Sequence, residues 1–394
     1  MVNLASKNNC TGCGACVNSC AHGALIMAAD NEGFLMPIVD TGKCVECGLC
    51  EKSCPIVSAV ENKNMEQPKT LAVWSLPDRA KSSSGGAFSA YARMVLKRGG
   101  VVFGVAFDGD MRLRHIGVET LEGLDALRGS KYVQSDVGDS YIRIRSLLRA
   151  GRHVLFCGTP CQVAGLKSFL RKDYENLLTL DLVCHGVPSG AVFRAYLRKL
   201  STRFAGMGKI TGFEFRRRDS WGFSPTVSLG GKLTKIYGKD NAYMNAFDKN
   251  AVFRRSCYDC PFAKIPRVGD CTIADFWGIG RHGVPFRHSI QKGVSLVLVN
   301  NSKGNEFTNA LEDVFIEERT LGEALIENHN ITCPSKKYPH RDAVIAAFLD
   351  KDVRLDVISR RYGLADRSLK GVVKELADRL HVLDCVKLIY NKMR

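Results

Sequence analysis

The sequence contains no apolar run that approaches about 18 residues, so we expect no helix that spans a membrane. Met1 is followed within a few residues by a cysteine cluster, not by the apolar segment of a secretory signal, and we expect a cytoplasmic protein with reduced thiols. The chain also lacks the low hydrophobic content of a disordered protein, because 45% of its 394 residues are hydrophobic and 24% are charged. This length predicts about two or three domains, each with its own core.

Cysteine, by contrast, is abundant, and half of the 16 cysteines lie in the first 54 residues. A chain of this length is not a small module held together by disulfides. The first eight cysteines form two runs with the spacing C-x2-C-x2-C-x3-C, which are Cys10, Cys13, Cys16 and Cys20, then Cys44, Cys47, Cys50 and Cys54. This spacing is typical of bacterial two-cluster ferredoxins, in which the fourth cysteine of each run binds the cluster of the other run.

The two runs therefore predict two 4Fe-4S clusters. One would be bound by Cys10, Cys13, Cys16 and Cys54, and the other by Cys44, Cys47, Cys50 and Cys20. We expect the fourth cysteine of each run to lie at the start of a helix. A pair of zinc knuckles is the alternative, although zinc sites take their ligands in two pairs and not as three plus one.

Lysine and arginine outnumber aspartate and glutamate by 56 to 40. A basic excess of this kind also occurs in nucleic-acid-binding proteins. The count treats every cysteine as neutral, however, whereas metal-bound cysteines are thiolates and an oxidised four-iron cluster with four of them carries a charge of about −2. We interpret the excess as compensation for anionic cofactors and acidic redox partners, and we expect no nucleic-acid binding.

Beyond a polar stretch at 56–69, the pattern changes to alternating strands and helices. Strands are expected at 71–74, 101–107, 154–157 and 178–184, and helices at 87–97 and 163–170. A serine–glycine turn at 82–86 precedes the first helix and could present N–H groups to an anion, although an ordinary helix cap has the same composition. A strand followed by a cysteine-bearing turn and a helix occurs twice, and ligand sites in open α/β sheets lie beyond such strand ends.

Six strings in this region resemble the beta-subunit family of coenzyme F420-reducing hydrogenase and F420-dependent formate dehydrogenase, to which hydroxymethyl-chlorophyll and vinyl-chlorophyllide reductases are related. They occur in the order of the family and cover roughly residues 70 to 330. The strings are SSSGGAFSA (82–90), GSKYVQS (129–135), GTPCQVAGLKSFL (158–170), LVCHGVPSG (182–190), FRRSCYDCPFAK (253–264) and VGDCTIADFWGIG (268–280). The resemblance implies a flavin, expected as FAD, and a third 4Fe-4S cluster beside it.

On this basis the third cluster would be bound by Cys161, Cys184, Cys257 and Cys260. A redox disulfide between the last two is the alternative. By match to the family strings, the flavin site would be lined by Ser82, Ser83, Ser84, Gly85, Gly86, Gly129, Ser130, Lys131, Tyr132, Gln134, Ser135, Gly158, Thr159 and Gln162. Asp275, Phe276 and Trp277 would close its floor, Cys157 would lie beside it, and Cys271 and Cys385 would be inert packing residues.

Two side chains are candidates for the chemistry. Lys131 could stabilise the anionic reduced flavin, and the alternative is an exposed lysine on a loop. His185 follows Cys184 and could donate a proton to the substrate, because histidine titrates near neutral pH; a purely structural histidine is the alternative.

The C-terminal region continues with helical patterns and basic residues. An apolar stripe at helical spacing consists of Leu369, Val372, Val373, Leu376, Leu380 and Leu383. The basic face consists of Lys370, Lys374, Arg379, Lys387, Lys392 and Arg394. We expect these helices to pack on their own domain, and a docking helix for a partner or an acidic membrane surface is the alternative.

The predicted architecture is thus α+β and α/β. It comprises a two-cluster ferredoxin domain at 1–58, a linker at 59–69, the two parts of one mixed α/β flavin- and cluster-binding domain at 70–150 and 151–332, and a helical basic tail at 333–394. We expect an oxidoreductase that moves electrons from reduced ferredoxin or a similar carrier, through three 4Fe-4S clusters, to a flavin that reduces a small organic substrate. A non-catalytic electron-transfer subunit of a larger complex is the alternative, and the chain could also form a homo-oligomer.

Overall fold

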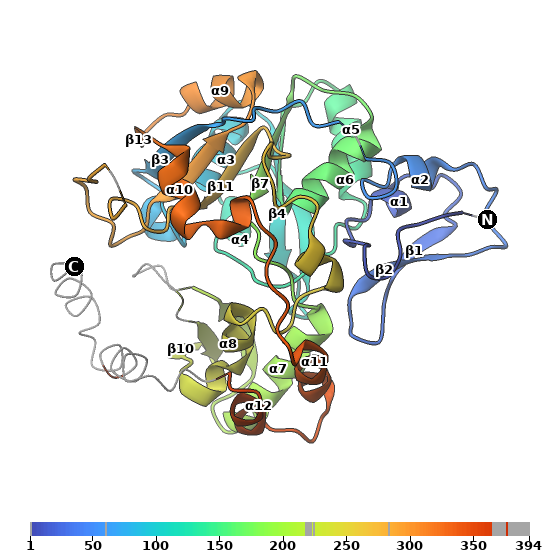
Figure 1. Ribbon diagram of the computed structural model, residues 1–394, viewed down its shortest axis with the longest axis vertical. Helices are drawn as coiled ribbons and strands as arrows, with labels where there is room; N and C mark the ends of the chain where they lie inside the picture. The colour runs from blue at the N-terminus through green and yellow to red at the C-terminus, as the bar shows by residue number, and fades with distance from the viewer. Residues whose placement is uncertain are drawn as a thin grey trace.

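The computed structural model describes residues 2–59, 61–216, 223, 225–282, 284–364 and 376. The two N-terminal cysteine runs lie in a small domain at one side of the molecule (Figure 1). This domain contains two short helices, α1 (Ala15–Asn18) and α2 (Leu49–Lys52), and an antiparallel hairpin of β1 (Leu25–Ala29) and β2 (Leu35–Val39). Among the described residues, no helix is long and apolar enough to cross a membrane.

The expected position of the fourth cysteine in each run is wrong. Each helix begins directly after a glycine in the left-handed region, Gly14 with φ 75° and Gly48 with φ 69°. The third cysteine of each run therefore lies inside the helix, and Cys20 and Cys54 follow the helix end. The cause is the glycine that directly follows the second cysteine of each run, because its left-handed backbone lets the helix begin at the next residue.

The main body is built on one eight-stranded sheet in the order β13-β3-β12-β11-β7-β6-β4-β5. The four strands β11, β7, β6 and β4 are parallel to their neighbours within this group, and the outer pairings are antiparallel. The strands are β3 (Lys69–Ser75), β4 (Val101–Phe107), β5 (Leu113–Val118), β6 (Val154–Gly158), β7 (Leu177–Leu182), β11 (Cys271–Asp275), β12 (Ser295–Val299) and β13 (Val314–Arg319). The expected mixed α/β class is confirmed.

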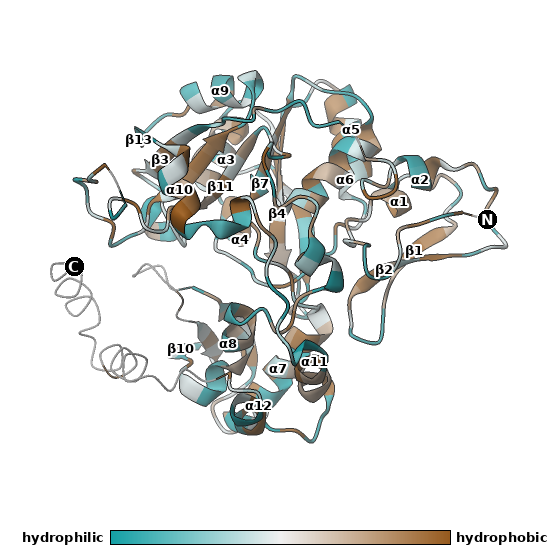
Figure 2. Cartoon of the chain, in the orientation of Figure 1, coloured by the Kyte–Doolittle hydropathy of each residue, from teal (hydrophilic) through white to brown (hydrophobic). Residues whose placement is uncertain are grey.

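Helices cover both faces of this sheet, and the central strands are accordingly apolar along much of their length (Figure 2). Along β4, Val102 packs with α3 on one face, whereas Val101 and Phe103 pack with α5 and α6 on the other, as alternating strand side chains must. The helices of the body are α3 (Ala87–Lys97), α4 (Leu124–Leu127), α5 (Ser140–Arg149), α6 (Pro160–Leu170), α9 (Ser302–Asn309) and α10 (Leu321–Glu327), with short 3-10 turns η1 (Arg79–Lys81), η3 (Arg255–Asp259) and η4 (His329–Ile331).

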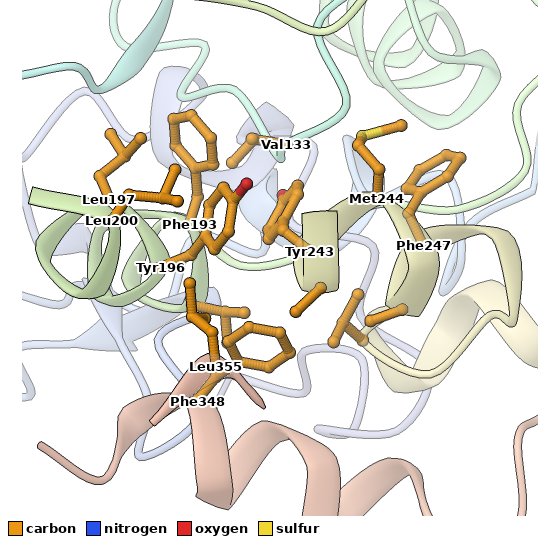
Figure 3. Close-up of a cluster of buried hydrophobic side chains, with 14 of the residues drawn as sticks. Val133, Phe193, Tyr196, Leu197, Leu200, Tyr243, Met244, Phe247, Phe348 and Leu355 are labelled. Atoms are coloured by element: carbon orange, nitrogen blue, oxygen red, sulfur yellow. The ribbon is translucent and has the colours of Figure 1, made fainter. Parts of the chain in front are cut away.

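A second module lies below the body in Figure 1 and has its own aromatic core. Figure 3 shows part of that core, in which Phe193, Tyr196, Tyr243 and Phe348 gather. Its elements are α7 (Gly190–Arg203), β8 (Ile210–Glu214), β9 (Thr226–Leu229), β10 (Lys232–Lys235), η2 (Gly238–Asn241), α8 (Ala242–Asp248), α11 (Arg341–Leu349) and α12 (Leu355–Arg361). Thus the described helices of the expected tail pack into this module. The expected apolar stripe and basic face lie outside the described residues, apart from the exposed Leu376.

The segment expected to be a linker is anchored along the body. The side-chain amides of Asn62 and Asn64 donate hydrogen bonds to the carbonyls of Pro266, Arg267 and Gly269, at 2.7 to 2.9 Å. These carbonyls belong to the loop that leads into β11. The described part of the segment contains no helix or strand before β3, and its asparagines satisfy the backbone of that loop.

Candidate functional site

A cavity of about 500 Å³ lies beyond the carboxyl ends of the parallel strands. Gly158 at the end of β6, Leu182 at the end of β7 and Asp275 at the end of β11 line it, together with the turn that precedes α3. This is the edge at which open α/β sheets bind their ligands. Its volume falls in the range of about 300–1,000 Å³ that is usual for cofactor and small-molecule sites.

Thirteen of the 14 residues expected at the flavin site line this cavity. They are Ser82, Ser83, Ser84, Gly86, Gly129, Ser130, Lys131, Tyr132, Gln134, Ser135, Gly158, Thr159 and Gln162. Gly85 is not part of this wall. A side chain on Gly85 would meet the carbonyl oxygen of Val73 at 2.3 Å, because the turn is pressed against β3 at that point.

Hydrogen bonds join the three strings that supply these residues. The backbone N–H of Ser130 donates to Ser83 Oγ at 3.0 Å, which ties the second string to the turn before α3. Gln162 Nε2 donates to Ser135 Oγ at 3.0 Å, and Gln162 Oε1 accepts from the N–H of Thr159 at 3.1 Å in a capping box at the start of α6. The cavity wall is therefore one bonded unit, although its parts are far apart in the sequence.

Lys131 is held in place and is not a loosely exposed loop lysine. Its ammonium group donates to the carbonyl oxygens of Leu127, Arg128 and Gly129 at 3.1, 2.9 and 3.2 Å. These carbonyls lie at and just after the end of α4, where a cation is favoured. The lysine thus brings a positive charge to the wall of the cavity.

The floor of the cavity contains an ion pair that the sequence did not reveal. The buried Arg216 forms a salt bridge with Asp275, and its guanidinium lies 5.3 Å from the Phe223 ring and 5.5 Å from the Trp277 ring. Asp275 and Trp277 line the cavity as expected, whereas Phe276 is fully buried in the core beneath it. Among the other cysteines, Cys157 lines the cavity, Cys271 is fully buried, and Cys385 lies outside the described residues.

Four cysteines surround a second, smaller cavity of about 40 Å³ next to the first. We call Cys161, Cys184, Cys257 and Cys260 the inner set. Cys161 lies in the first turn of α6, Cys184 follows β7, Cys257 lies in η3, and Cys260 follows η3. Burial, together with the neighbouring Cys260, raises the pKa of Cys161 to about 11, and burial raises that of Cys257 to about 12 with a contribution from Cys161.

The inner set suits a 4Fe-4S cluster in its donor chemistry, because it supplies four thiols within electrostatic reach of one another. Thiols with raised pKa values are protonated at neutral pH, so that binding of a cluster would release their protons. The 15 described cysteines are all free thiols, including Cys257 and Cys260.

Four cysteines of the ferredoxin domain also share a cavity. A cavity of about 20 Å³ is lined by Cys10, Cys13, Cys16 and Cys54, which we call the proximal set. Burial, together with the nearby Cys10 and Cys54, raises the pKa of Cys16 to about 12. The remaining four, Cys20, Cys44, Cys47 and Cys50, are the distal set; within it burial raises the pKa of Cys50, to which Cys44 contributes, and Cys47 is exposed to solvent.

Thr11 lines all three cavities. It lies between Cys10 of the proximal set and Gly12, and it belongs to the ferredoxin domain. Gln134, on the wall of the large cavity, donates to the Thr11 carbonyl at 3.4 Å. The sequence carries no signal for this role, because Thr11 is a spacer residue between two cysteines and the contact is made only by folding.

His185 lines both the large cavity and the inner one. Burial lowers the pKa of its imidazole, and the neighbouring His329 adds to this effect. Its backbone carbonyl accepts a hydrogen bond from Ser335 Oγ at 2.5 Å, which anchors this loop to the segment that leads into α11. The imidazole therefore lies where the inner set and the large cavity meet.

Parts of this chain match two known protein families. Residues 151–323 match the family described as the C terminus of the coenzyme F420 hydrogenase/dehydrogenase beta subunit, and residues 9–58 match the 4Fe-4S dicluster domain. The chain is 23% identical over 284 residues to the F subunit of the F420H2 dehydrogenase from Methanosarcina mazei, a match that covers 68% of this chain and 77% of the relative. The resemblance and the N-terminal ferredoxin domain expected from the sequence are confirmed.

Among solved structures, the chain is similar to a chain of the F420-reducing NiFe hydrogenase complex from Methanosarcina barkeri. The identity is 15% and the TM-score is 0.43, over 77% of this chain and 94% of that chain.

Proposed function

Because the chain joins a 4Fe-4S dicluster domain to a domain of the coenzyme F420 hydrogenase/dehydrogenase beta-subunit family, we propose that it is an iron–sulfur flavoenzyme. The chain takes electrons from reduced ferredoxin or a similar low-potential carrier and delivers them to a small organic substrate at the large cavity. Three 4Fe-4S clusters and one FAD are its cofactors. When bound, the flavin accepts single electrons and passes on a hydride equivalent.

The observation that carries this proposal is the position of Thr11 at the meeting point of the three cavities. The cavity of the proximal set, the cavity of the inner set and the large cavity all have Thr11 in their walls. The distal set, with its exposed Cys47, is the part of the ferredoxin domain that an external carrier can reach. The residues are thus ordered from the surface to the cavity.

The walls of the large cavity support a flavin with a diphosphate group. Ser83 Oγ accepts from the N–H of Ser130 and keeps its own hydrogen for an anion, whereas Ser82 Oγ and Ser84 Oγ donate to backbone carbonyls. The N-terminus of α3, a helix of 11 residues, lies on the same side. Lys131, fixed by three carbonyls, adds a positive charge that would stabilise negative charge on the reduced ring system. His185 would give the substrate its proton, and its lowered pKa makes the imidazolium a stronger acid.

A second candidate function is that of an electron-transfer subunit whose substrate is reduced on another polypeptide. The named relative from Methanosarcina mazei, one subunit of a dehydrogenase, favours it. In that case coenzyme F420 or a partner subunit would exchange electrons at the large cavity.

Anaerobic stopped-flow mixing of the purified chain with reduced ferredoxin distinguishes both functions from a purely structural role of the clusters. We expect cluster bleaching followed by flavin bleaching within the isolated chain. Absence of flavin reduction, with the clusters reduced, would contradict the proposed path. Turnover of candidate substrates by the isolated chain supports the enzyme, and turnover only after addition of partner subunits supports the electron-transfer subunit.

A further inference from the structure

Arg254 is buried between the ferredoxin domain and the main body, with an exposed fraction of 2%. Its Nε donates to the carbonyl oxygen of Cys10 at 2.6 Å, and its Nη1 donates to the carbonyl oxygen of Leu35 at 3.0 Å and to Gln134 Oε1 at 3.3 Å. Its Nη2 contacts the thioether of Met36. Every one of these acceptors is uncharged.

The other buried arginines of the described chain are different. Four of them form salt bridges with carboxylates: Arg216 with Asp275, Arg267 with Asp181, Arg319 with Glu323, and Arg341 with Glu32. Within the described residues, no carboxylate lies within salt-bridge distance of Arg254. A buried charge without a counter-charge is unfavourable, and an anion other than a carboxylate would balance that of Arg254.

Cysteines of two sets adjoin Arg254. Arg254 precedes Cys257 of the inner set by three residues, and its guanidinium holds the backbone of Cys10 of the proximal set. The N–H of Cys257 donates to the carbonyl oxygen of Arg254 at 3.0 Å, because Arg254 directly precedes η3, the turn that carries Cys257. Arg254 therefore adjoins the inner set while its guanidinium is bonded to the proximal loop.

We propose that Arg254 is the shared counter-charge of the proximal and inner clusters, and that it raises the reduction potential of both. Its hydrogen bonds position the proximal loop, and its charge sets the potentials at which the two clusters transfer electrons. The inference rests on the proposed function, because the two clusters are the anions that it would balance.

The direction of the effect follows from charge. An oxidised four-iron cluster with four thiolates carries about −2, and reduction adds one more negative charge. A buried cation nearby stabilises the reduced state more than the oxidised one, and the low dielectric of the interior strengthens that preference. Removal of the cation should therefore make both clusters harder to reduce.

Arg341 provides a matched control. It is fully buried, and its Nε donates to the carbonyl oxygen of Phe253, the residue before Arg254, at 2.8 Å. Its guanidinium lies 5.8 Å from the Phe34 ring, and that of Arg254 lies 5.6 Å from the same ring. Arg341, however, is paired with Glu32 and Asp342, so its removal takes away a cation that already has counter-charges.

The test is a redox titration of the anaerobically purified full chain, followed by electron paramagnetic resonance, with Arg254→Met, Arg254→Lys and Arg341→Met. In Arg254→Met, we expect the equilibrium constant for reduction of two of the three clusters to fall at least tenfold. This corresponds to a midpoint potential that is lower by about 59 mV for one electron. The Lys variant should stay within about threefold of the parent, since it keeps the charge. Arg341→Met should change none of the clusters by more than about threefold.

Iron and sulfide analysis of each variant completes the test. If Arg254→Met keeps all its iron and its midpoints match the parent, the proposal is overturned. If it loses iron while Arg254→Lys assembles with the parent's midpoints, the charge is required, as proposed. Loss of iron from both variants would mean that the hydrogen bonds and not the charge matter, which overturns it too. A parent chain without clusters would instead contradict the proposed function itself.

Discussion

The ferredoxin domain and the inner set assemble four-cysteine sites in opposite ways. In the N-terminal runs, three ligands of each site lie within seven residues, and the sequence predicts the set directly. The inner set is drawn from a span of 100 residues, between Cys161 and Cys260, and the start of α6, the end of β7 and the turn η3 bring it together. A site of the first kind can be recognised from spacing, whereas a site of the second kind is predicted only through the resemblance to the family strings.

Removal of one thiol from the inner set tests most directly whether the two kinds of site assemble independently. Cys260→Ala should lose the inner cluster and keep both ferredoxin clusters, because the N-terminal runs contribute eight ligands of their own. Electron transfer from reduced ferredoxin to the flavin should slow by orders of magnitude in stopped-flow, since the relay is gone. Cys333→Ala, at an exposed cysteine that lines none of the three cavities, is the control. Parent-like flavin reduction after loss of the inner cluster would make that cluster structural.

Removal of a thiol from the proximal set tests the crossed pairing. Cys54→Ala should empty the site of Cys10, Cys13 and Cys16 and leave the distal set able to assemble, because Cys54 lines the proximal cavity. Iron per chain should fall by about four, and one of the two ferredoxin signals should disappear from the resonance spectrum. If the signal of the proximal cluster remained and that of the distal cluster disappeared, Cys54 would belong to the distal set.

Lys131→Ala tests the large cavity, whose predicted binding residues also come from separate parts of the sequence. The substitution removes the positive charge that three carbonyls hold at the wall. We expect FAD to be retained roughly tenfold more weakly, the usual effect of losing one contact to a charged group. Equilibrium dialysis of the full chain measures this, and Lys97→Ala, at an exposed surface pair, is the control. Unchanged retention together with an unchanged flavin potential would place Lys131 outside the site.

The smallest effect concerns packing under the cavity. A methyl group at Gly85 would meet backbone atoms of Val73 and Ser295 at 2.3 and 2.5 Å, so Gly85→Ala should destabilise the chain by about 1–3 kcal/mol in denaturant unfolding. Gly322→Ala is the matched control, because nothing lies within 4 Å of its added methyl group. Equal unfolding midpoints for the two variants would show that the turn before α3 is not pressed against the sheet.

The sequence predicts the fold class, the family resemblance and the ferredoxin domain because each depends on local patterns: cysteine spacing, alternating apolar strands and strings in family order. It fails where packing decides. The helix start in each run depends on Gly14 and Gly48, and the place of Gly85 depends on β3. Thr11 and Arg254 act through contacts between residues more than 100 positions apart, for which a single sequence holds no signal.

The most direct test of the central claim is the cofactor content of the anaerobically purified chain. Twelve cysteines in three sets predict about 12 irons and about 12 sulfides per chain, with about one FAD released by acid. Iron near eight would remove the inner cluster and with it the path to the large cavity. Stoichiometric zinc in place of iron would contradict the account as a whole.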